Sequence, residues 1–79
     1  MRKEIHTMTH KASKVVDSAE TANHLDGAYK YCMNMAHVFE KDYVDEAKVA
    51  IAEIDDFLQV YNDLLDRIDS KRRNINQFK

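Results

Sequence analysis

The second half of this 79-residue chain carries a regular apolar stripe. Its members follow at alternating steps of three and four: Val44, Ala47, Ile51, Ile54, Leu58, Tyr61, Leu65, Ile68 and, after a miss at Arg72, Ile75. This a/d spacing is typical of an amphipathic helix that packs along a partner helix. Acids stand at the start of the stripe and bases near its end, as the helix dipole favours. We therefore expect one helix over residues 44–76.

The first half begins with the same pattern and then loses its regularity. Its apolar positions are Ile5, Met8, Ala12, Val15, Ala19, Ala22, Leu25, Tyr29, Cys32, Ala36 and Phe39. The extra step of three that leads to Leu25 is a stammer, which overwinds a coiled coil locally. The chain's one glycine, Gly27, follows Asp26 to form a turn-forming pair just beyond it. We favour one distorted helix over residues 3–40, and the alternative is a break near Asp26-Gly27.

Residues 41–43 are the natural connection between these two helices. Three residues suit a helical hairpin, and Asp42 can cap the second helix. The two arms match in length, which favours an antiparallel hairpin of two long helices over a three-helix bundle. A single glycine and no proline agree with an all-α chain. The predicted fold is one helical domain over residues 1–79 that assembles with further copies into a helical bundle.

A second apolar row lies outside the stripe, in the part of each arm nearest the connection. It consists of Tyr31, Met35, Val38, Phe57, Val60 and Leu64. A hairpin has one inside face, so a second row needs another cover. Self-association through these six residues is the explanation we favour, because so short a chain buries little surface alone. The alternative is a monomer bent into three helices that buries the same residues.

The charges along the chain are strongly polarised although the formal net charge is only −2. Both ends are basic, and residues 17–66 hold twelve acids against three lysines. An antiparallel hairpin would bring the two basic ends together into one pole, made of Lys3, Lys11, Lys14, Arg67, Lys71, Arg72 and Arg73 together with Arg2 and Lys79. The helix dipole explains the C-terminal cations but opposes those at the N-terminus. The polarity therefore suggests an anion-binding pole for nucleic acid or a nucleotide.

The sequence offers no convincing catalytic or metal site. His6 and His10 share a helical face, but two ligands are too few for a structural metal site. The pair Glu53 and Asp56 lacks the matching acidic pair that metal-dependent hydrolysis requires. Cys32 lies on the apolar stripe, where a buried packing role is expected. We expect no catalysis, no obligatory metal and no cofactor.

The single cysteine and the lack of an apolar segment behind the first charges favour a cytoplasmic protein without a signal peptide. No run approaches the roughly 18 apolar residues of a membrane span. The main hypothesis is a homo-oligomeric helical-hairpin regulator or inhibitor that acts through protein–protein interaction. The second hypothesis is an anion binder that uses the basic pole.

Overall fold

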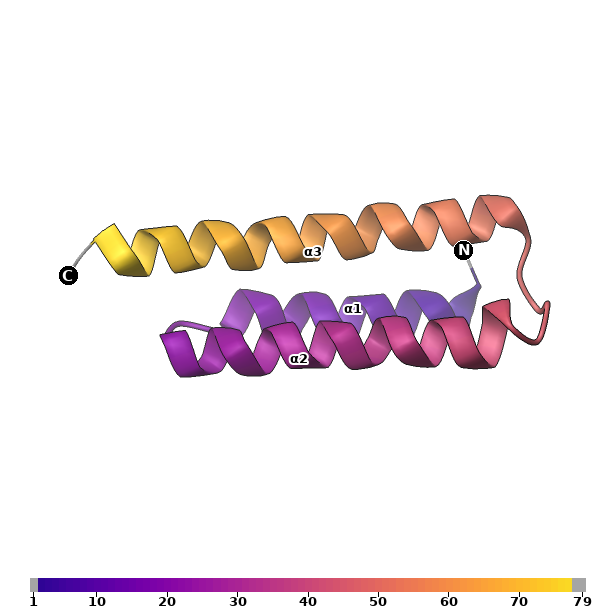
Figure 1. Ribbon diagram of the computed structural model, residues 1–79, viewed down its shortest axis with the longest axis horizontal. Coiled ribbons are helices and arrows are strands. Elements are labelled where there is room, and N and C mark those ends of the chain that lie inside the picture. Colours follow the sequence, from indigo (N-terminus) through magenta and orange to yellow (C-terminus); the bar gives the residue numbers. More distant parts are fainter. Residues whose placement is uncertain (1, 78–79) are drawn as a thin grey trace.

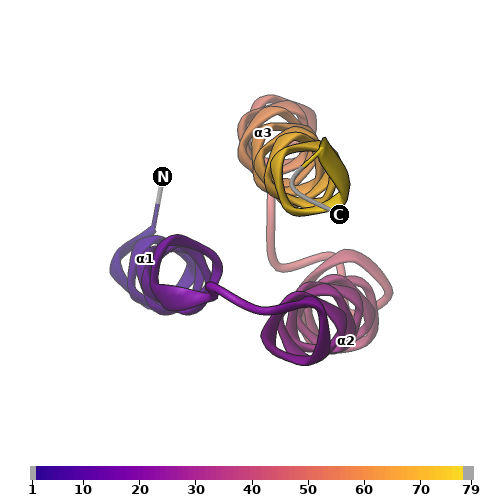
Figure 2. The same cartoon turned by 90° about the vertical axis from the view of Figure 1, so that its left-hand side faces the viewer.

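Three helices form an up-down-up bundle in the computed structural model, which describes residues 2–77 and their side chains as far as Ile75 (Figure 1). Helix α1 spans Lys3–Ser18, α2 spans Ala22–Phe39 and α3 spans Ile51–Gln77, and a π-helical turn, Glu40–Val44, extends α2. Seen end-on, the three helices stand at the corners of a triangle (Figure 2). The prediction of an all-α helical bundle is confirmed, but the three helices come from one chain.

The continuous first helix was a wrong prediction, because the chain turns between Ser18 and Ala22. Ala19 adopts an extended conformation (φ −73°, ψ 124°), which ends α1. Thr21 is also extended, and its hydroxyl accepts a hydrogen bond from the backbone N–H of His24 at 3.2 Å. A threonine in this position is a favourable N-cap, so α2 begins directly after it. The irregular step in the apolar pattern marks this turn, whereas Gly27 lies inside α2.

The connection between α2 and α3 also differs from the predicted loop at 41–43. Helical backbone continues to Val44 and then reverses at Ala47, whose φ of 54° is left-handed. The N–H of Lys48 donates to the carbonyl of Tyr43 at 2.8 Å, and the N–H of Ala47 donates to that of Val44 at 3.0 Å. These two bonds form a Schellman motif, in which glycine usually occupies the left-handed position. Because alanine and not glycine occupies this position, no local sequence signal marks this helix end.

Helix α3 keeps most of its predicted stripe on the core, with Ile68 buried and Ile54, Tyr61 and Leu65 packed against the core, but the buried face extends to the second apolar row. Phe57 and Leu64, from the second apolar row, are almost completely buried. Two members of the predicted stripe are exposed instead: Ile51 keeps 79% of its surface and Leu58 keeps 46%. The reason is that α3 packs against both α1 and α2, so its buried face must be centred between the two. The third helix thus supplies the cover that a hairpin would have needed from another copy.

The core is closed at the α2–α3 connection by a row of aromatic rings. Phe39 and Phe57 stack with their centroids 3.9 Å apart and their planes 10° from parallel. Tyr43 extends the row from Phe39 at 5.8 Å, and Tyr61 extends it from Phe57 at 6.1 Å. These rings hold the end of α2 against the first turns of α3, which fixes the register of the two helices.

The up-down-up order separates the two ends of the chain. The first residues of α1 lie beside the start of α3, where Arg2 Nε approaches Glu53 Oε2 at 3.2 Å (Figure 1). Lys71 lies 18 residues farther along α3, a distance of about 27 Å along a helix. The predicted pole depended on a hairpin that places both termini at one end, whereas here Arg2 and Lys3 lie at the opposite end of the bundle from Lys71.

Candidate functional site

Lys71 joins α3 to the end of α1 and has a structural role. Its ammonium group donates to three backbone carbonyls: Val16 at 2.9 Å, Asp17 at 2.7 Å and Ala19 at 2.9 Å. The last carbonyls of a helix have no partner within the helix and carry the negative end of its dipole. Lys71 therefore caps α1 from a position more than fifty residues away in the sequence.

Arg67 holds the same two helices together one turn earlier. Its NH1 group donates to Ser13 Oγ at 2.9 Å and lies 3.4 Å from Asp17 Oδ1. Its NH2 group lies 2.7 Å from Asp63 Oδ2 on α3. The guanidinium is thus shared between two carboxylates and a hydroxyl, and its charge is largely satisfied inside the molecule.

The next two arginines also have acidic partners. Arg72 donates to Asp26 Oδ1 at 2.7 Å and lies over the ring of Tyr29, 5.6 Å from its centroid. Arg73 pairs with Asp69 at 2.7 Å, one turn away on the same helix. The four cations from Arg67 to Arg73 therefore fasten α3 to its neighbours or to itself, which accounts for their charge without an external anion.

The three lysines of α1 are arranged differently. Lys3, Lys11 and Lys14 are exposed, and in the described part of the chain none of them forms an ion pair or a side-chain hydrogen bond. Lys3 lies at the end of the molecule far from Lys71. The structure thus divides the predicted anion site into an internally paired group on α3 and an unpaired group on α1.

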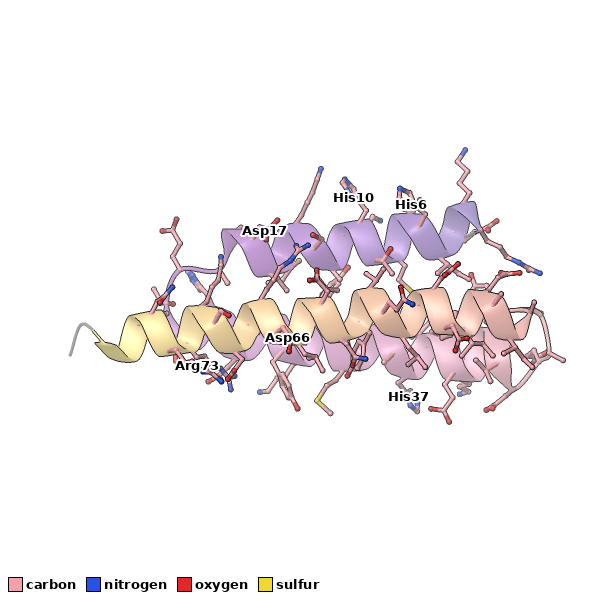
Figure 3. All side chains as sticks on the ribbon, turned by 90° about the horizontal axis from the view of Figure 1, so that it is seen from above. His6, His10, Asp17, His37, Asp66 and Arg73 are labelled. Atoms are coloured by element: carbon pink, nitrogen blue, oxygen red, sulfur yellow. The ribbon has the colours of Figure 1, made fainter. Side chains whose placement is uncertain are left out.

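The candidate metal and catalytic residues do not converge. The rings of His6 and His10 stack 6.3 Å apart on the outside of α1 (Figure 3). Over residues 2–77 no group of three or more His, Cys, Asp or Glu side chains is placed to hold a metal ion. Glu53 faces α1 and pairs with Arg2. Cys32 is fully buried, and burial raises the pKa of its thiol.

The six residues of the predicted oligomer interface fall into two groups. Met35, Phe57 and Leu64 are buried within a single chain, and Val60 is half-buried. Tyr31 and Val38 keep 39% and 43% of their surface and line a shallow groove between α1 and α2. Because the three-helix bundle already covers Met35, Phe57 and Leu64, these residues no longer indicate self-association.

A more apolar surface lies between α2 and α3. Its groove, near the α2–α3 connection, is lined by Ala36, Phe39, Glu40, Val44, Asp45, Ile54, Phe57, Leu58 and Tyr61. Leu58 in its wall keeps 46% of its surface exposed, and Ile51, seven residues earlier, lies on the same face of α3 and keeps 79%. We call this surface the α2–α3 groove. Sequence reasoning missed it because Ile51 and Leu58 fit an a/d stripe and were assigned to the inside.

The charged residues around the α2–α3 groove are mostly acidic. Glu40 and Asp45, the two charged residues that line it, are both acids. Asp55 follows Ile51 by four residues and precedes Leu58 by three, so it neighbours both on the helix surface. None of these three acids has an ion-pair partner among the described side chains.

The fold and this surface define a small three-helix bundle with one apolar, acid-rimmed groove. Comparisons with protein-family models, with curated proteins and with solved structures find no match. Of the helices described, none is both long and apolar enough to cross a membrane. The function must therefore be argued from the groove and the charges themselves.

Proposed function

We propose that the protein is a non-enzymatic interaction module that binds an amphipathic helix of a partner protein in the α2–α3 groove. The observation that supports this most is the exposure of Ile51 and Leu58 on one face of α3, where Leu58 lines the groove. These two side chains are not part of the buried core, so packing within the chain does not account for them. An exposed apolar patch is typical of an interaction site.

The shape of the surface favours a helix as the ligand. Two helices that lie side by side leave a groove parallel to their axes, and a further helix laid in it completes a four-helix arrangement. Apolar side chains from both walls, such as Ala36, Ile54 and Leu58, would then contact the apolar stripe of the incoming helix. A helix of about 18 residues, about 27 Å long, would reach along most of the bundle.

The acids at the α2–α3 groove favour a ligand of positive charge. Glu40 and Asp45 line the groove, and Asp55 neighbours Leu58 on the surface of α3. Unpaired acids repel an acidic helix and attract one whose apolar stripe is flanked by lysine or arginine. The partner segment is therefore a basic amphipathic helix. Regulation or inhibition of that partner would follow from covering its apolar stripe.

A pair of synthetic helical peptides tests this proposal. Both carry the same leucine stripe over about 18 residues, one with lysines beside it and the other with glutamates. We expect the lysine peptide to bind at least about tenfold more tightly in fluorescence anisotropy, a difference of about 1.4 kcal/mol. Leu58→Glu places a charge in the middle of the groove and should abolish most of this binding.

Val38→Glu is the matched control, because Val38 is as exposed as Leu58 but lies in the α1–α2 groove. It should leave the affinity within about twofold. Circular dichroism on both variants checks that each remains helical. Equal losses in the two variants, or equal binding of the two peptides, would contradict the proposal. Sedimentation of the unmutated chain as a dimer that Leu58→Glu splits would assign the groove to a second copy instead.

A further inference from the structure

The outer face of α1 carries a row of lysine, threonine and histidine side chains. Lys3, Thr7, His10 and Lys14 follow at steps of four, three and four residues, which places them in one row along the helix. Lys11 and His6 flank this row. Figure 3 shows His6 and His10 pointing away from the other two helices. We call this face the α1 ridge; it extends over about 16 Å from Lys3 to Lys14.

No contact within the described part of the chain accounts for the positive charge of the lysines on the α1 ridge. The described cations that serve the fold, namely Arg2, Arg67, Lys71, Arg72 and Arg73, each contact an acid or a helix carbonyl. The lysines of the α1 ridge make no such contact in the described part of the chain. Lys3 stands in the first turn of α1, where the helix dipole disfavours a cation. The α1 ridge thus carries charge at some cost to its own helix.

We infer that the α1 ridge binds the phosphate backbone of double-stranded nucleic acid. Lysine and histidine donors suit phosphate oxygens, and contacts of this kind depend on charge rather than on base sequence. The separation of Lys3 from Lys14, about 16 Å, exceeds the width of a major groove, about 12 Å. Lysines at the two ends of the α1 ridge can therefore contact phosphates of both strands.

The composition of the α1 ridge favours a duplex over other polyanions. Single-stranded nucleic acid is usually held by aromatic side chains that stack on bases, and the α1 ridge has no aromatic residue other than its histidines. A helix that lies on a membrane needs a large apolar face, and the outer side of α1 has none. Glu40 and Asp45, the acids that line the α2–α3 groove, belong to the π-helical turn and its C-cap, so they are not part of the α1 ridge.

Fluorescence anisotropy with a labelled DNA duplex of about 20 base pairs tests the inference at salt from about 20 to about 200 mM. We expect binding at low salt that weakens steeply as salt rises. The triple variant Lys3→Gln, Lys11→Gln, Lys14→Gln should lose at least about tenfold in affinity. Its log–log salt slope should fall by about 2 to 3, because each lost phosphate contact removes about 0.9.

The matched control is Lys30→Gln, Lys41→Gln, Lys48→Gln, which removes the same number of charges from α2, the π-helical turn and the α2–α3 connection. It should change the affinity by less than about threefold. An equal loss in the two triple variants would overturn the inference, as would no binding at about 20 mM salt. Lysine-dependent binding to phosphatidylserine vesicles without binding to the duplex would also overturn it and assign the α1 ridge to a membrane surface.

Discussion

Replacing Lys71 with methionine should destabilise the bundle more than any other removal of a single surface charge. The substitution keeps most of the apolar stem and removes the ammonium group that caps α1. Three carbonyls then lose the ammonium group as a donor: those of Asp17 and Ala19, and that of Val16, which keeps a bond from the N–H of Ala19 at 3.2 Å. Val16 and Ala19 are buried residues, so water replaces the ammonium group poorly there.

The expected cost is about 2–3 kcal/mol in the free energy of unfolding. A hydrogen bond to a charged group contributes about 1.5–3 kcal/mol, and the three bonds share one donor, so their energies do not add. A cation at a helix C-terminus contributes about 0.3–1 kcal/mol more. The carbonyl of the exposed Asp17 is hydrated after the substitution, which limits the total. For a chain of this length, the melting temperature should fall by about 10–20 °C.

Urea denaturation followed by circular dichroism measures this cost. Lys30→Met is the control, because Lys30 is exposed on the outside of α2, and it should change stability by no more than about 0.5 kcal/mol. Lys71→Arg should recover only part of the loss, since a planar guanidinium cannot direct its donors to three carbonyls as one ammonium does. If Lys71→Met matched the control, the capping of α1 from α3 would be refuted.

Three further predictions concern the backbone, the buried ionisable groups and the assembly of the core. Gly27→Ala should raise the free energy of unfolding by about 0.5–1 kcal/mol in urea titrations, because alanine favours the helix and its Cβ would meet nothing within 4 Å. Ala47→Gly should raise it by a similar amount, because Ala47 is left-handed and glycine adopts that conformation without strain. A loss of stability in either variant would contradict this. Burial raises the pKa of Cys32 above its ordinary value of 9.0 and that of Tyr61 above 10.0. The folded chain therefore holds these protons more tightly than the unfolded chain, so stability should be level below pH 9 and decline above it; urea midpoints that stay constant to pH 10.5 would exclude this linkage. Because Phe57 and Leu64 are covered within one chain, the melting temperature should not change over about a tenfold range of protein concentration; a rise with concentration would show that a further copy covers the core.

The helical class could be predicted from the sequence, but the number of helices could not. Apolar spacing fixed the amphipathic character of residues 51–77 and of both earlier helices. The turn at Ala19–Thr21 was signalled by the irregular apolar step and by a threonine cap. The pair Asp26-Gly27 seemed the stronger turn signal, yet one glycine inside a helix costs only about 1 kcal/mol. Packing of α2 against α3 outweighs that cost.

The functional surfaces were less predictable because they depend on which helices are neighbours. Leu58 and Phe57 are adjacent in sequence and both strongly apolar, and the packing of α3 against both α1 and α2 decides that Phe57 is buried and Leu58 exposed. The partners of Lys71 lie more than fifty residues away, so no local pattern reveals that its charge is used within the fold. The lysines of α1 were recognised as unexplained charge, but the hairpin wrongly placed Lys3 beside the C-terminal cations.

The most direct test of the central claim is a nuclear magnetic resonance map of the bound lysine-flanked peptide on the isotopically labelled chain. Occupation of the α2–α3 groove should shift the backbone signals of Met33, Ala36 and Leu58 most strongly and leave those of Met8 and Val38 nearly unchanged. Shifts centred on Met8 and Val38 would place the ligand in the α1–α2 groove and contradict the account, as would a saturating excess of peptide that moves no signal.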